Sequence, residues 1–214
     1  YFNFMHEDYF YKFYPKELQY KTIIFGVEPD VYKNLNSDFK NREKLKIVNS
    51  GAMGKNTLKS RIANRVLNPK RSGWYFYKLR TLCNNLEYVT HTRELEKKFL
   101  DLSYPELLSK FRAAIAATTF YPTIKYWETS AAGCLTFMEI TKQNNGDYLG
   151  YTNGENSIFI NEKNYEEKFQ EYLSDPDNKK WEQIASSGKE FTMNNFSNDE
   201  AVKQLVTLFE SMKK

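Results

Sequence analysis

Two periods of hydrophobic and polar residues alternate along this chain, one typical of buried strands and one typical of amphipathic helices. Short β-branched or apolar runs predict strands at residues 22–27, 45–51, 86–90, 113–118, 134–137 and 157–160. Apolar positions at helical spacing predict helices near residues 58–66, 74–80, 104–111, 121–132, 165–172, 181–188 and 198–209. Alternating strands and helices are typical of a parallel sheet with helices on both faces, so the sequence predicts an α/β, Rossmann-like domain.

Residues with special backbone or capping properties predict several helix ends. Pro122 suits the first turn of the helix that carries Glu128, and Gly133 is expected to end that helix in a left-handed conformation. Pro105 suits the first turn of an earlier helix, and Ser197 is expected to cap the last one.

The composition indicates a folded domain with weak overall charge. Of the 214 residues, 41% are hydrophobic, which is enough for one substantial core, and the formal net charge is +4. Acidic and basic residues are interleaved along most of the chain, which argues against a dedicated nucleic-acid surface. Residues 55–80 differ, because they contain eight Lys and Arg residues and no Asp or Glu. We therefore expect this segment to attract an anion.

The cysteine content and the hydropathy predict a protein of a reducing compartment. Two cysteines, Cys83 and Cys134, are too few to cross-link a secreted scaffold. No apolar run approaches the length of a membrane span, and no secretory signal pattern is present, so we expect a cytoplasmic protein. The chain begins with Tyr1 rather than Met, and we expect it to be a piece of a longer protein.

Glu128 is a single carboxylate in an otherwise weakly charged helix, and it has two interpretations. Lys125 lies three residues earlier, so the two could form an ion pair on a solvated face, a common arrangement that adds little stability. Alternatively, the carboxylate serves a ligand at the rim of the sheet. The residues that surround Glu128 favour the second interpretation through their resemblance to a known family.

The run from Lys125 to Leu135 resembles the nucleotide-sugar signature of glycosyltransferases with the GT-B fold, in which a Glu is followed by an Ala-Ala-Gly helix end and an apolar strand. It looks most like the group 1 (family 4-like) transferases and the spore-maturation type of glycosyltransferase-like proteins. Two shorter runs, 22–32 and 151–160, also resemble the family. The first matches the family's crossing from its first domain into its second.

The resemblance implies a division of the chain. Residues 22–214 would be the carboxy-terminal, nucleotide-sugar-binding half of a GT-B fold, and residues 1–21 a segment from the interdomain region. In the family the matching Glu accepts hydrogen bonds from the ribose hydroxyls of the donor, a role that the resemblance gives to Glu128. A second Glu usually stands eight positions earlier, where this chain has Phe120. This departure weakens the case for the family's standard retaining mechanism, and no catalytic residue is assigned.

Turns after the predicted strands supply candidate contacts to the donor diphosphate. The turn at Gly51 joins a strand to a helix, which leaves backbone amides and the positive end of the helix dipole free for phosphate, and Lys59 or Arg61 would add charge. His91 follows a strand, at the edge where open α/β sheets bind ligands, and the turn at 118–125 opens onto the same edge. The predicted donor-binding residues are therefore Glu128, Gly51, Lys59, Arg61, His91, Thr119, Tyr121 and Lys125.

The resemblance predicts a glycosyltransferase that passes a sugar from a nucleotide-diphosphate sugar to an unknown acceptor, without a metal or another cofactor. Its partners would be the donor, a glycan, protein or lipid acceptor, and a first GT-B domain that this chain lacks. No nucleic acid is expected, and peripheral membrane association is a further option. Two other functions stay open: a sugar-nucleotide epimerase-like enzyme, and a non-catalytic nucleotide-binding or interaction module. We expect the fragment alone to bind nucleotide but to turn over slowly or not at all.

Overall fold

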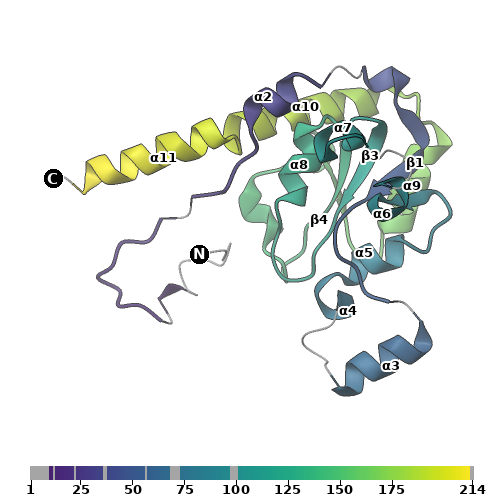
Figure 1. Ribbon diagram of the computed structural model, residues 1–214, viewed down its shortest axis with the longest axis horizontal. Helices are drawn as coiled ribbons and strands as arrows, with labels where there is room; N and C mark the ends of the chain where they lie inside the picture. Colours follow the sequence, from purple (N-terminus) through teal and green to yellow (C-terminus); the bar gives the residue numbers. More distant parts are fainter. Residues whose placement is uncertain are drawn as a thin grey trace.

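A central parallel sheet organises the part of the chain that the computed structural model describes (Figure 1). This part comprises residues 10–11, 13–21, 23–35, 38–55, 57–67, 73–96 and 101–212, without the side chains of residues 61, 64, 65 and 96. The strands run in the order β2-β1-β3-β4-β5, and every neighbouring pair is parallel. Their bounds are β1 Glu43–Asn49, β2 Val89–His91, β3 Phe111–Ala116, β4 Leu135–Glu139 and β5 Ile158–Ile160. The predicted α/β, Rossmann-like fold is confirmed.

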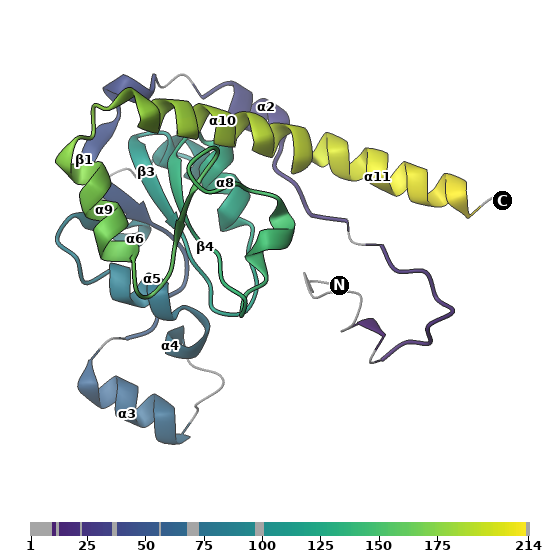
Figure 2. The ribbon, with the colours of Figure 1, turned by 180° about the vertical axis from the view of Figure 1, so that it is seen from behind.

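Helices cover both faces of the sheet (Figures 1 and 2). The α-helices are α2 Pro29–Lys33, α3 Leu58–Leu67, α4 Gly73–Phe76, α5 Lys78–Cys83, α6 Thr92–Glu96, α7 Tyr104–Leu108, α8 Lys125–Ala131, α9 Tyr165–Ser174, α10 Lys179–Asn195 and α11 Asn198–Ser211. The 3₁₀ helices are η1 Phe39–Asn41 and η2 Gly146–Leu149.

Successive residues of the central strands point to opposite faces of the sheet, which divides the core into two layers. One layer holds Trp127 together with apolar residues from α7 and α8. The other holds Phe137 together with residues from α5, α9 and α10. Phe137 meets Phe169 of α9 edge to face, with ring centroids 4.8 Å apart. Burying a side chain of this size contributes roughly 1.5–3 kcal/mol, so the two layers fix the helices against the sheet.

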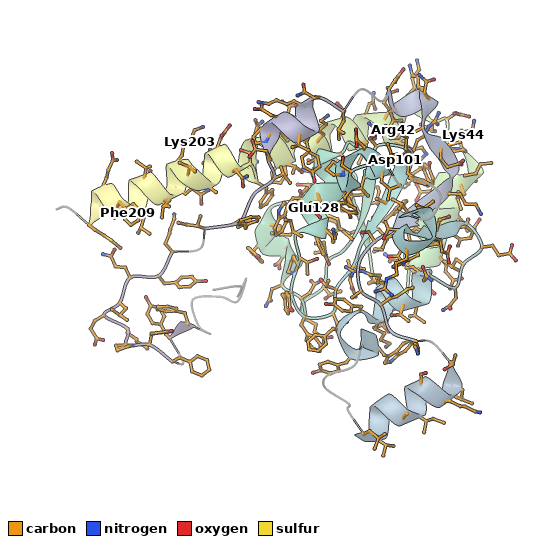
Figure 3. The ribbon with its side chains drawn as sticks, in the orientation of Figure 1. Arg42, Lys44, Asp101, Glu128, Lys203 and Phe209 are labelled. Carbon is orange, nitrogen blue, oxygen red and sulfur yellow. The ribbon has the colours of Figure 1, made fainter. Side chains whose placement is uncertain are left out.

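The C-terminal helix α11 extends away from the body of the domain (Figures 1 and 2). Ser197 caps it as predicted, because its Oγ accepts a hydrogen bond from the Glu200 amide. Lys203 and Phe209 lie on the extended part (Figure 3), and most of the large apolar side chains of α11 are exposed. No helix among the described residues combines the length and the apolar character needed to cross a bilayer.

The predicted strand bounds are shifted by one to three residues in the structure, and one predicted strand is absent from the described residues. Residues 23–26 form no strand, and Val27 makes a single parallel bridge to Ser197, so this run meets the start of α11 instead of the sheet. Thr22 lies outside the described residues. The second strand of the sequence begins at Val89, because residues 86–88 form a turn, and it includes His91.

Helix bounds also differ from the prediction, and the largest difference is in α10, which ends at Asn195 instead of residue 188. Pro122 lies before α8, which begins only at Lys125, whereas Gly133 follows that helix with a φ of +75°, as predicted. Phe111 opens β3 instead of extending the helix that starts at Tyr104, because that helix ends at Leu108.

The described residues of the crossover from β1 to β2 form three helices, and among these residues only α5 enters the core, through Leu79 and Cys83. The helix predicted over residues 58–66 is confirmed as α3, but its apolar stripe faces solvent. The helix predicted over residues 74–80 is divided into α4 and α5, and α4 buries no residue.

Cys83 and Cys134 are both free and buried. Burial raises the pKa of both thiols, that of Cys134 to about 11. Both side chains therefore stay protonated at neutral pH and serve packing.

Candidate functional site

The carboxyl ends of the parallel strands lie along one edge of the sheet, which we call the carboxyl edge. Gly51 follows β1, His91 ends β2 and Thr119 follows β3, so three predicted site residues lie along it. Glu128 comes from α8, the helix that precedes β4 (Figure 3). In open α/β sheets this edge is where ligands bind.

The turn at residues 50–52, the Gly51 turn, is held by His91. Gly51 has a φ of +96°, a conformation that glycine adopts without strain. The buried His91 ring lies with Nε2 2.9 Å from the Gly51 carbonyl, and its Nδ1 accepts a hydrogen bond from the Arg93 amide at 3.2 Å. Because Nδ1 accepts, the proton lies on Nε2, which donates to Gly51. Both ring nitrogens are engaged with the backbone, so the ring positions the turn.

Arg80 of α5 lies under the Gly51 turn, and sequence reasoning missed it as a site residue. Its side chain is buried, with 2% of the residue exposed. Nη1 donates to the Ala52 carbonyl at 3.0 Å, and the guanidinium lies 4.8 Å from the centroid of the Tyr77 ring. A Cβ atom at Gly51 would lie 2.7 Å from Nη1. The glycine therefore lets the turn and the guanidinium approach each other closely.

Two donors of the Arg80 guanidinium have no partner. Nε and Nη2 are buried and make no hydrogen bond to any residue that the structure describes. Burial lowers the pKa of this guanidinium, because the surroundings solvate its charge less well than water does. A buried cation with two unused donors beside a glycine turn favours an anion. The sequence signal was the cation-rich run at 55–80, which does not indicate which of its members becomes buried.

Glu128 is connected to the Gly51 turn through two intervening side chains, which reach Ser50 of the turn. Lys125 Nζ lies 2.7 Å from Glu128 Oε2 and 3.7 Å from the centroid of the Tyr104 ring. The Tyr104 hydroxyl donates to Ser50 Oγ at 2.7 Å. The side chains of Glu128 and Lys125 are only 16% and 22% exposed, so the ion pair does not lie on a solvated face. Burial is the main cause that raises the pKa of Tyr104, and the Glu128 charge raises it further.

Phe120, at the position of the family's earlier carboxylate, belongs to an aromatic cluster. Its ring centroid lies 4.4 Å from that of Tyr75 and 5.7 Å from that of Phe76. Thr119 joins the same region, since its amide donates to the Phe76 carbonyl at 3.0 Å. The turn after β3 is thus packed on α4 by apolar rings.

The other predicted residues differ in their distance from this edge. Tyr121 accepts a hydrogen bond from Thr118 Oγ1 through its carbonyl, which closes the turn after β3. Lys59 is exposed on α3, a helix that projects beyond α4 and α5 (Figures 1 and 2). The side chain of Arg61 lies outside the described residues.

Glu139, the last residue of β4, is a buried carboxylate that the sequence analysis did not single out. Its Oε2 has no hydrogen-bond partner among the described residues. Burial, and then the Glu162 charge, raise its pKa to about 8, although Arg80 and Lys78 oppose the shift. An acidic residue at the end of an otherwise apolar strand was the available signal. The carboxyl edge therefore holds a buried cation and a carboxyl group that is largely protonated at neutral pH.

A hollow of about 750 Å³ lies at the opposite edge of the sheet, at the amino ends of β1 and β3. Arg112 lines it but is fully engaged, with hydrogen bonds to the Phe39, Lys40 and Pro176 carbonyls and to Asp177. Arg42, the other buried cation that lines the hollow, donates to the Ala132 and Gly133 carbonyls. Because both buried cations of the hollow are engaged in this way, we place the candidate site at the carboxyl edge.

Comparison with protein families settles the classification. The model of the family described as glycosyl transferase-like matches residues 65–207, more than half of the chain. The chain belongs to this glycosyl transferase-like family. No curated protein sequence matches it.

Solved glycosyltransferase structures share the fold of this glycosyl transferase-like protein. A glycosyltransferase from Rickettsia africae has a TM-score of 0.58 at 13% identity, over 90% of this chain and 57% of that chain. HepE from Anabaena in complex with UDP has a TM-score of 0.54 at 13% identity, over 90% of this chain and 57% of the HepE chain. Sucrose-phosphate synthase from Thermosynechococcus elongatus has a TM-score of 0.54 at 13% identity, over 96% of this chain and 56% of the synthase chain.

These matches confirm the resemblance to GT-B glycosyltransferases that the sequence indicated. The glycosyl transferase-like chain spans a little over half the length of each of these solved proteins. At such low identity the likeness of the structures concerns the fold.

Proposed function

We propose that this domain binds a nucleotide-diphosphate sugar at the carboxyl edge, so that the glycosyl group can pass to an acceptor. The observation that carries the proposal is the link from Glu128 through Lys125, Tyr104 and Ser50 to the Gly51 turn. This link holds a mostly buried carboxylate at a fixed place relative to a glycine turn. The same arrangement serves a ligand that has hydroxyl groups at one end and phosphates at the other.

Each part of the site has a role in this proposal. The Glu128 carboxylate accepts hydrogen bonds from the ribose hydroxyls, and Lys125 fixes its orientation. The Gly51 turn offers backbone amides to the diphosphate, and the buried charge of Arg80 favours the anion there. His91 holds the turn through the Gly51 carbonyl.

The positive groups of the site matter most when the glycosidic bond of the donor breaks. In glycosyl transfer the bond between the anomeric carbon and the β-phosphate oxygen breaks, and the acceptor oxygen bonds to that carbon. Negative charge then grows on the departing diphosphate, and fixed positive groups that are already in place stabilise it. Arg80 and the turn amides supply this stabilisation without a metal ion.

The acceptor site is proposed to lie on the rest of a longer polypeptide. The chain spans a little over half the length of the solved glycosyltransferases that it matches. We therefore expect the isolated domain to bind nucleotide but to transfer sugar slowly or not at all.

The decisive experiment is a calorimetric titration of the 214-residue chain with UDP, the nucleotide in the HepE structure, with ADP and GDP in parallel. Glu128→Gln keeps the shape of the side chain but removes its charge, and we expect about a tenfold or larger loss of affinity. Glu167→Gln is the matched control, because Glu167 is an exposed carboxylate on α9. Absence of binding by all three nucleotides, or equal affinity of both variants, would refute the proposed site.

One observation favours a second candidate function, a nucleotide-binding module that does not transfer sugar. Phe120 occupies the position of the family's earlier carboxylate and is packed between Tyr75 and Phe76, so no acidic group can take that place. The two functions differ in turnover by the full-length protein. Release of free nucleotide from a sugar nucleotide, dependent on an acceptor mixture, supports transfer, whereas binding without release supports the module.

A further inference from the structure

The segment between Gly54 and Gly73 leaves the domain and returns to it at one point. A Cβ atom at Gly54 would lie 2.5 Å from the Trp74 amide nitrogen, and one at Gly73 would lie 2.9 Å from the Met53 carbonyl oxygen. The two backbones therefore touch, and we call this contact the glycine neck. The Gly54 amide also donates to Thr81 Oγ1 at 2.8 Å, which fixes the neck to α5. Helix α3, beyond the neck, projects from the end of the domain (Figures 1 and 2).

Helix α3 presents an apolar face that no other part of the described structure covers. Leu58, Ile62 and Val66 are spaced four residues apart and so lie on one side of the helix. Together with Leu67 they are between 57% and 80% exposed. Neither layer of the core contains a residue of α3. Large apolar side chains gathered on one exposed helix mark a surface for a partner or a membrane.

The segment that contains this face carries charge of one sign. Residues 55–80 contain no Asp or Glu, and α3 itself carries Lys59, Arg61 and Arg65. Lys55 and Lys59 are exposed, and neither forms an ion pair with a residue that the structure describes. A cationic helix with an apolar face suits a partner in which an anionic outer layer covers an apolar interior, as headgroups cover acyl chains in a lipid bilayer.

Helix α11 provides an internal comparison. It also exposes apolar residues, among them Val202, Val206 and Phe209, but its sequence includes Asp199, Glu200 and Glu210. An exposed apolar face is therefore present twice in the described structure, whereas its combination with a purely cationic segment is found at α3. The positive charge of the α3 segment therefore indicates that its apolar face binds a partner with an anionic surface.

We propose that α3 is an interfacial anchor that docks this domain on an anionic lipid bilayer. Leu58, Ile62 and Val66 enter the boundary between headgroups and acyl chains, and the surrounding Lys and Arg residues contact the headgroups. The helix lies in the plane of the membrane and does not cross it. Since the chain enters the neck directly from the end of β1, docking through α3 turns the carboxyl edge toward the bilayer. The inference rests on α3 alone and does not depend on nucleotide binding.

Vesicle flotation of the 214-residue chain tests the proposal. We expect binding to vesicles of phosphatidylcholine mixed with phosphatidylglycerol and little binding to phosphatidylcholine alone. Raising the salt from about 0.1 M to about 1 M, which shortens the Debye length from about 10 Å to about 3 Å, is expected to weaken binding. Binding that is equal for both vesicle types would overturn the proposal.

Matched variants assign the binding to α3. The triple variant Leu58→Gln, Ile62→Gln, Val66→Gln is expected to lose about tenfold or more of the vesicle affinity, because it removes the apolar contribution. These side chains are exposed, so circular dichroism should show an unchanged fold. The triple variant Val202→Gln, Val206→Gln, Phe209→Gln on α11 is expected to bind like the parent chain. The reverse pattern would place the membrane contact on α11 and refute the inference.

A site-specific label separates docking by α3 from adsorption of the whole protein. Cys83 and Cys134 are buried, so a thiol-reactive fluorophore can be directed to Ile62→Cys or, as a control, to Val202→Cys. We expect a blue shift on addition of anionic vesicles from the label on α3 and none from the label on α11. If the α3 label shifts with protein concentration in the absence of lipid, the face binds a second copy of the chain, and the lipid proposal is wrong.

Discussion

The guanidinium of Arg80 and the backbone of Gly51 are in such close contact that a methyl group on Gly51 would lie 2.7 Å from Arg80 Nη1. The contact joins α5 to the end of β1, two elements that the fold places on the carboxyl edge. It also keeps a buried positive charge immediately behind a glycine turn. The turn and the cation therefore act as one unit, and substitutions in either should affect nucleotide binding.

Substitution of Gly51 by Ala is expected to weaken UDP binding more than it weakens the fold. The φ of +96° strains an alanine by about 1–2 kcal/mol, and the added methyl group displaces the guanidinium from the Ala52 carbonyl. Calorimetric titration and urea unfolding measure the two effects. Gly154→Ala is the control, because Gly154 has a φ of +80° with nothing within 4 Å of a Cβ. If both variants bind UDP equally well, the contact with Arg80 has no part in binding.

Replacement of Arg80 by Met is expected to separate stability from function. Met keeps much of the apolar stem but removes a buried charge with two unsatisfied donors, so the free energy of unfolding should be unchanged or higher. UDP affinity should fall about tenfold or more, because a charge-assisted contact is lost.

Arg112→Met is the counterpart of this variant at the opposite edge of the sheet. Arg112 is also buried, but it donates hydrogen bonds to Asp177 and to three backbone carbonyls, and its replacement removes all of them. We expect it to lose about 3 kcal/mol of stability while the folded protein keeps its UDP affinity. A stability loss for Arg80→Met as large as that for Arg112→Met would contradict the view that Arg80 awaits an anion.

Removal of the Tyr104 hydroxyl tests the link between Glu128 and the Gly51 turn. Tyr104→Phe deletes the hydrogen bond to Ser50 but keeps the ring under Lys125, and it should cost about 1 kcal/mol of stability. It should also weaken UDP binding severalfold, since the carboxylate and the turn are then held less firmly. Tyr172→Phe removes a similar bond, to the Lys44 carbonyl, far from the carboxyl edge, and should leave affinity unchanged. Equal affinity of both variants would show that the link is only structural.

The buried carboxyl of Glu139 predicts a pH dependence of stability. Its pKa is raised from 4.5 to about 8 in the folded chain, mainly by burial, so between these values the native state holds a proton that the unfolded state has lost. Stability should therefore fall as the pH rises from 4.5 to 8, by at most roughly 1.4 kcal/mol per pH unit, and level off above 8.

Glu139→Gln should remove this contribution, so that the variant gains stability relative to the parent chain as the pH rises. Urea unfolding at a series of pH values measures the difference between the two proteins. Glu162→Gln removes the second cause of the shift and should move the plateau to lower pH. Parallel curves for the parent and Glu139→Gln would mean that the carboxyl is already ionised in the folded state.

The spacing of apolar residues predicted the elements of the fold, because this spacing shows which face of a helix or strand becomes buried. The buried runs of β3 and β4, and the glycine that ends α8, could be identified from a few neighbouring residues. The run at 22–27 was wrong as a strand because a strand needs a neighbouring strand as well as β-branched residues. The described part of this run forms a β-bridge only to Ser197.

The site was predicted in part, and the limit was contact between distant residues. The Lys125–Glu128 pair follows from a spacing of three, but the contact between Tyr104 and Ser50 joins residues that no local pattern connects. Arg80 and Glu139 were missed because a charged residue usually lies on the surface, and only the tertiary packing shows that these two are buried. The apolar stripe of α3 was predicted correctly as a pattern, yet the pattern alone could not show that nothing in the described structure covers it.

The glycine neck, where Gly54 and Gly73 are in contact, affects how the sequence of this protein can change in evolution. Because both ends of the intervening stretch emerge side by side, that stretch can be lengthened, shortened or replaced without altering the path of β1 or α5. Its sequence can thus change while the sheet and its carboxyl edge keep their structure. If α3 docks on a membrane as proposed, replacing this stretch alone would change where the domain docks and leave the carboxyl edge as it is.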